Sequence, residues 1–98
     1  MTNESLEMKS KETIVFGEIS SSLGTRDLGA KLRRDIIDKM STSEKVFLDF
    51  SGVDVVTNSF ADECFRKLRE IVKDEIFKQK TAFINTNDFV QRVIISAL

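Results

Sequence analysis

One stretch decides the fold of this 98-residue chain: VFLDFSGVDVVTNSFADECFRKL, residues 46–68. Its first five residues are almost continuously apolar, which is typical of a central strand that helices cover on both faces. From Phe60 onward, apolar residues recur at helical spacing and predict an amphipathic helix. The polar tripeptide Thr57-Asn58-Ser59 lies between the two, and each of its residues is a candidate N-cap. The stretch therefore predicts a strand, a corner and a helix.

Two further strands are predicted on either side of this stretch. Residues 13–19 (TIVFGEI) and 81–84 (TAFI) are rich in β-branched and aromatic residues, which favour strands. Residues 6–11 alternate weakly between apolar and polar, so we expect an edge strand or a frayed tail there, within residues 1–11. A hairpin near residues 10–11 would join this edge strand to the next one.

Helical periodicity appears in three places. Residues 25–40, 60–72 and 90–98 each carry apolar side chains three and four residues apart, and Thr25 is the expected N-cap of the first helix. Strands that alternate with helices indicate a parallel sheet with right-handed crossovers. We therefore predict an α/β fold, a single domain over residues 1–98, with a mostly parallel or mixed sheet of about four strands and three helices.

The loops that follow parallel strands meet at one edge of the sheet, which is where such sheets usually bind ligands and partners. Three polar loops would gather there: residues 20–25, 57–59 and 85–88. They are rich in hydroxyl and amide groups. Arg26 follows the first loop and is either part of this binding surface or an ordinary surface arginine.

Composition argues against several classes of partner. Fifteen basic and sixteen acidic residues leave a net charge of −1, so the chain lacks the one-signed field that nucleic acid or anionic lipid would favour. No apolar run approaches the roughly 20 residues that a membrane span needs, and the N-terminal MTNESLEMKSKE is unlike a secretion signal. The single cysteine, Cys64, falls on an apolar helix face. We expect a cytoplasmic protein that binds neither nucleic acid nor membrane.

An enzyme is the weaker interpretation. The chain has no histidine, the commonest general base and a frequent zinc ligand. Asp49, Asp54 and Asp62 could serve a small enzyme, but Asp49 is better explained as the anchor of the loop that follows its strand. Residues 24–31 resemble a phosphate-binding loop, except that Lys31 comes one residue late. We expect a non-catalytic protein that needs no cofactor and no metal.

Three motifs carry a family resemblance: LGTR, LDFSGV and SFADE, at residues 23–26, 48–53 and 59–63. With them the chain resembles a STAS domain, and more closely the STAS-like family of unknown function, over residues 6–98. The resemblance implies a sheet of four or five strands with helices. It also implies a role in bacterial signalling, through contact with another protein.

The resemblance further singles out Ser59. In the anti-sigma-factor antagonists that typify STAS domains, the corner reads Asp-Ser-Ser-Gly, and a partner that is both kinase and anti-sigma factor phosphorylates the second serine. Ser59 falls on that serine, whereas Thr57, Asn58 and Phe60 replace the other three residues. The implied partner is a histidine-kinase-like ATPase, and Ser59 is either a phosphosite or simply a helix cap.

The expected partner-binding surface surrounds this corner. It consists of Thr57, Asn58, Ser59, Phe60, Asp62, Glu63 and Arg26. An alternative function is a constitutive structural or assembly domain that binds a fixed partner without phosphorylation. That partner would contact Phe89, Ile95 and the open sheet edge.

Overall fold

A computed structural model describes residues 10–98, so the strand or tail expected over residues 6–9 lies outside the described part. Strands β1 (Lys11–Val15), β3 (Lys45–Asp49) and β5 (Thr81–Ile84) form a parallel sheet in the order β1-β3-β5. Strand β3 is central, as predicted. A second parallel sheet in the described part pairs β2 (Ser22–Leu23) with β4 (Val55–Val56).

Helices follow the strands in alternation. They are α2 (Arg26–Thr42), the continuous segment α3 (Asn58–Ala61), η2 (Asp62–Arg66) and α4 (Lys67–Val72), then α5 (Asp74–Lys80) and α6 (Asp88–Ala97), with a short 3₁₀ turn η1 (Phe16–Glu18). The predicted cap of α2 is confirmed, because the Thr25 hydroxyl accepts a hydrogen bond from the Leu28 amide at 3.2 Å. Asn87 caps α6 in the same way, accepting from the Val90 amide at 2.7 Å.

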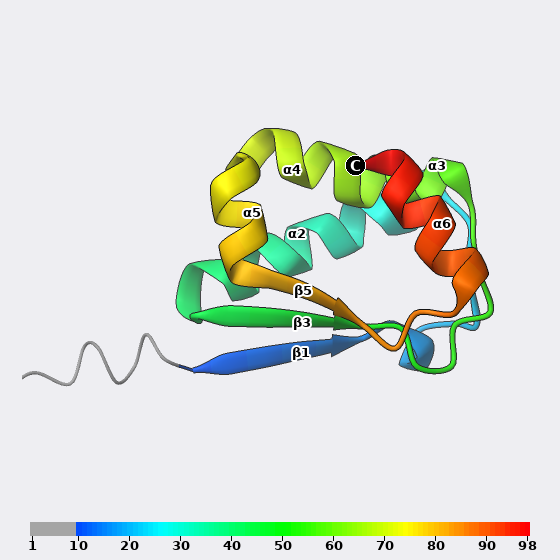
Figure 1. Cartoon of the computed structure of the whole chain (residues 1–98), viewed down its shortest axis with the longest axis horizontal. Coiled ribbons are helices and arrows are strands. Elements are labelled where there is room, and N and C mark those ends of the chain that lie inside the picture. Colours follow the sequence, from blue (N-terminus) through cyan, green and yellow to red (C-terminus); the bar gives the residue numbers. More distant parts are fainter. Residues whose placement is uncertain (1–9) are drawn as a thin grey trace, which may run out of the picture.

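The prediction that helices cover the central strand on both faces is wrong. Figure 1 shows α2, α4 and α5 over the same face of the sheet. Val46 and Leu48 of β3 are buried against these helices, whereas Lys45, Phe47 and Asp49 alternate onto the opposite face and are only half-buried. The run of apolar residues looked continuous because Phe47 occupies the outer face of the strand.

The core between sheet and helices is built around aromatic rings. The Phe65 ring lies 5.1 Å from the Phe83 ring and about 6 Å from three others, those of Phe16, Phe50 and Phe60. Cys64 is also buried in this core, as predicted. Burial raises the pKa of its thiol well above the usual value, so the thiol stays protonated and unreactive.

The counts of strands and helices differ from the prediction. Residues 10–98 contain five strands in two sheets, and four helices when 58–72 is taken as one. Strands β2 and β4 have two residues each, which is too short to produce a periodic pattern. Helix α5 buries only Phe77, so it lacks the apolar stripe by which helices are recognised.

Two local predictions are also wrong. The expected hairpin near residues 10–11 does not form at Lys11, which begins β1 and pairs in parallel with Lys45. Ile71 belongs to the apolar pattern that predicted a buried helix face over residues 60–72, but it lies exposed. Helix α4 ends one residue later, at Val72, where the chain turns into α5.

No described helix is long and apolar enough to cross a membrane.

Candidate functional site

Three polar loops meet at one end of the sheets, as the parallel arrangement predicts. The Thr57 amide donates to the Leu23 carbonyl at 3.0 Å, and the Asp54 amide donates to the Ser21 carbonyl at 2.8 Å. From the third loop, the Asn87 side-chain amide donates to the Asp54 carbonyl at 3.2 Å. Backbone and side-chain hydrogen bonds therefore hold the three corners in a defined arrangement.

Thr57 is the residue that caps the helix of the central corner. Its hydroxyl accepts from the Phe60 amide at 3.0 Å and donates to the Gly24 carbonyl at 2.9 Å, which ties the helix start to the first loop. Ser59 lies two residues after the N-cap position, within the first turn of the helix. Among residues 10–98, the Ser59 hydroxyl makes no hydrogen bond, and its side chain is half-buried. The capping role of the tripeptide thus belongs to Thr57 and leaves the Ser59 hydroxyl available.

This division of roles predicts unequal effects of two alanine substitutions. Thr57→Ala is expected to lower the free energy of unfolding by about 1 to 2 kcal/mol, because it removes the cap and the donor to the Gly24 carbonyl. Ser59→Ala, the matched control in the same turn, should change it by less than about 0.5 kcal/mol. Urea denaturation followed by circular dichroism measures both values. Equal losses would contradict the assignment of the cap.

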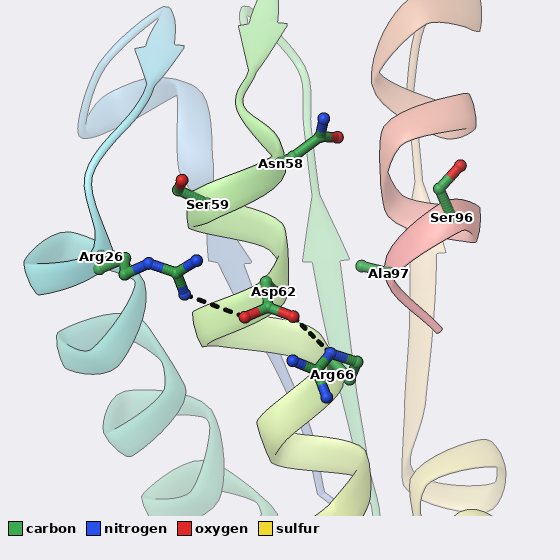
Figure 2. A pocket seen from close by; sticks show the side chains of 7 residues that line it. All are labelled: Arg26, Asn58, Ser59, Asp62, Arg66, Ser96 and Ala97. Atoms are coloured by element: carbon green, nitrogen blue, oxygen red, sulfur yellow. Dashed lines mark hydrogen bonds and ion pairs between the residues drawn. The ribbon is translucent and has the colours of Figure 1, made fainter.

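A polar cleft of about 550 Å³ opens beside this helix start. Figure 2 shows Arg26 reaching in from α2, Asp62 and Arg66 along the central helix, and Ser96 with Ala97 on the facing helix α6. Asn58 and Ser59 form its upper rim. Of the residues expected at the partner surface, the cleft therefore brings together four: Arg26, Asn58, Ser59 and Asp62.

Sequence reasoning missed the cleft residues Arg66, Ser96 and Ala97. Arg66 forms an ion pair with Asp62, which lies four residues earlier on the same helix. Its second role, lining a cleft, depends on α6 lying across from it. No local pattern of the sequence signals that approach, because it results from the packing of α6 against α3.

Asp62 bridges the two arginines of the cleft. The Arg26 Nη1 atom lies 2.9 Å from Asp62 Oδ2, and the Arg66 Nε atom donates to Asp62 Oδ1. Hydrogen bonds from Arg66 and then from Arg26 lower the pKa of the Asp62 carboxyl to about 2. The carboxylate is therefore ionised at neutral pH, and the bridge is lost only as the pH falls toward that value.

Glu63 does not line the cleft, and it lies in a π-helical turn of the central helix, η2. The Lys67 amide bonds to the Asp62 carbonyl, five residues back, instead of to the Glu63 carbonyl. Arg33 of α2 donates to that carbonyl and, at 3.1 Å, to the Glu63 carboxylate. Hydrogen bonds from Lys67 and Arg33 lower the pKa of Glu63. Only 13% of the Glu63 side chain is exposed, and its ion pair with Arg33 links the central helix to α2.

Phe60 cannot contact a partner in this structure, because its side chain is completely buried. The expected surface is thus corrected at this position.

Asp49 accepts three hydrogen bonds at the end of its strand. They come from the Ser51 backbone amide at 2.9 Å, the Ser51 hydroxyl at 2.8 Å and the Asn85 side-chain amide at 3.0 Å. These bonds, with the one from Asn85 foremost, lower its pKa. This is the geometry that a loop-anchoring role requires.

The carboxylates considered for an enzyme do not converge. Of Asp49, Asp54 and Asp62, only Asp62 lines the cleft. Within residues 10–98, no group of three or more potential ligand side chains could hold a metal ion. The cleft offers guanidinium, hydroxyl and amide groups instead, which are suited to binding polar or anionic groups.

Comparison with protein families gave one match. The model of one protein family, described as "STAS-like domain of unknown function (DUF4325)", matches residues 29–91. The matched range includes Ser59, Asp62 and Arg66 and leaves out Arg26 and Ser96. Comparison with curated proteins and with solved structures found no match.

Proposed function

Because the chain belongs to the family of STAS-like domains of unknown function, we propose that it is a non-catalytic interaction module that docks a signalling partner at the cleft. The observation that carries this proposal is the state of the Ser59 hydroxyl. It lies at the rim of a polar cleft and takes no part in the cap, which Thr57 supplies. A half-exposed hydroxyl without a structural task is free to serve recognition.

The sharper form of the proposal is a phosphorylation switch at Ser59. A phosphate would add about 1.5 to 2 negative charges at a cleft whose two arginines and one aspartate carry a net charge of +1. The sign of the local charge would therefore reverse. Phosphorylation would act on whatever docks there, while the Thr57 cap would continue to hold the helix start.

The partner we propose is a protein of the histidine-kinase-like ATPase class, in the bacterial cytoplasm. This follows from the resemblance of the corner to that of anti-sigma-factor antagonists. The alternative is a constitutive assembly domain that holds a fixed partner. It is favoured by the exposure of Phe89 and Ile95 on α6.

Substitution of Ser59 tests the proposal. In pull-downs from the native cell, we expect Ser59→Asp to change recovery of the partner severalfold, because it places a carboxylate at the cleft rim. Ser59→Ala should retain binding and abolish phosphorylation, which mass spectrometry of the protein from its native cell detects. Ser41→Asp is the matched control, since Ser41 is an exposed serine at the far end of α2.

Two outcomes would decide against the switch. If no phosphate is found and all three variants recover the partner equally, Ser59 does not regulate docking. If one fixed partner is recovered instead, and substitution of Phe89 or Ile95 abolishes its recovery, the result would support the assembly domain.

A further inference from the structure

We propose that the cleft is an oxyanion seat in which Arg26 and Arg66 together hold a phosphate monoester. This inference rests on the proposed function and names the chemical group that the docking site recognises. It is carried by the two guanidinium groups, by the hydroxyl and amide groups around them, and by the carboxylate that holds the two arginines in place.

Both guanidinium groups have hydrogen-bond donors to spare. Arg26 makes its contacts with Asp62 and Glu63 through Nη1 alone, at 2.9 and 3.4 Å. Arg66 uses Nε toward Asp62 and Nη1 toward Glu70. A guanidinium carries five N–H donors. Within residues 10–98, the Nε and Nη2 atoms of Arg26 and the Nη2 atom of Arg66 have no hydrogen-bond partner. Each arginine side chain is about half exposed, so a ligand can reach these donors.

Asp62 positions the two arginines for a common ligand. Figure 2 shows its carboxylate between them, bonded to one guanidinium on each side. This bridge reduces the freedom of two long side chains before a ligand arrives, which lowers the entropic cost of binding. Ser59, Asn58 and Ser96 line the same cleft and add hydroxyl and amide groups to its walls.

The charge of the cleft favours a dianion over a monoanion. A ligand carboxylate resembles Asp62 itself, and it would gain little where an intramolecular carboxylate already engages both arginines. A phosphate monoester carries nearly two charges and three acceptor oxygens at neutral pH. We expect its three oxygens to accept from the spare donors of the two guanidinium groups, because arginine forms strong charge-assisted hydrogen bonds to phosphate.

Titration of the full chain with O-phosphoserine, monitored by NMR of the backbone amides, tests the seat. We expect saturable shifts confined to the cleft, with a dissociation constant in the millimolar range, and none with acetate at equal ionic strength. Arg26→Gln and Arg66→Gln should each weaken binding about tenfold or more, since each removes a charged donor. Arg92→Gln is the matched control, because Arg92 is an exposed arginine of α6 that does not line the cleft.

The pH dependence provides a second readout. Phosphoserine loses its second proton with a pKa of about 6. The carboxylates that contact the two arginines are Asp62, whose pKa is about 2, Glu63, whose pKa is lowered by hydrogen bonds from Lys67 and Arg33, and Glu70; the chain has no histidine. Binding should therefore weaken severalfold between about pH 7.5 and about pH 5, following the ligand. Binding that is unchanged over this range, or that acetate reproduces, would overturn the dianion seat.

Two sources could supply the phosphate: Ser59 of this chain or a group on another molecule. A chain that carries phosphoserine at position 59 distinguishes these two sources. If the seat holds its own phosphate, this chain no longer binds added phosphoserine; if the source is external, binding persists. Shifts that survive both arginine substitutions would overturn the inference. If the native partner were still recovered in that case, the docking function would stand without the phosphate seat.

Discussion

Replacing Phe65 by alanine is expected to lower the free energy of unfolding by about 3 to 5 kcal/mol, the usual cost of removing a large buried aromatic ring. Phe65 is 0% exposed, and its ring packs against four other phenylalanine rings. Truncation leaves a cavity at the point where strands and helices meet, and it also removes the aromatic pair contacts. A domain of this size has only about 5 to 15 kcal/mol of stability.

Urea denaturation, followed by circular dichroism, measures this effect. The matched control is Phe89→Ala, which removes the same ring from a residue of α6 that is 47% exposed. We expect the control to change the free energy of unfolding by less than about 1 kcal/mol. A loss of similar size in both variants would contradict the placement of Phe65 at the centre of the core.

Gly17→Ala is the second substitution with a large expected effect. An added Cβ would lie 1.9 Å from the Ser51 carbonyl oxygen and 3.0 Å from the Ser51 carbonyl carbon. These are backbone atoms of the turn that follows β3, so no side-chain rotation can relieve the clash. Overpacking usually costs about 1 to 3 kcal/mol, and we expect a loss at or above the upper end of this range.

Gly24→Ala is its control. The added Cβ at this position would meet only the Thr57 methyl group, at 3.6 Å, which is an ordinary contact. Alanine also reduces the freedom of the unfolded chain, so the effect should be neutral or stabilising by up to about 1 kcal/mol. Thermal unfolding of the two variants gives the comparison. A Gly17→Ala protein as stable as Gly24→Ala would mean that η1, which contains Gly17, and the turn after β3 are farther apart than described.

The candidate site could be foreseen only in part. Parallel strands place their following loops together, so the meeting of the polar corners at Ser21, Thr57 and Asn87 followed from the order of the elements. The spacing of four residues between Asp62 and Arg66 also suits the ion pair that they form on the helix. The choice of cap among Thr57, Asn58 and Ser59 stayed open, because all three residue types can cap a helix and only the backbone path selects one.

Local pattern by itself determined the central strand, the amphipathic helices and the Thr25 cap, because these depend on residues a few positions apart. Tertiary structure decided what joins distant parts of the chain. It placed α2, α4 and α5 on one face of the sheet and set α6 across from Arg66. It also supplied Arg33, thirty residues away, to the Glu63 carbonyl that the π-helical turn frees. Such contacts have no period in the sequence, since they depend on how whole elements pack against one another.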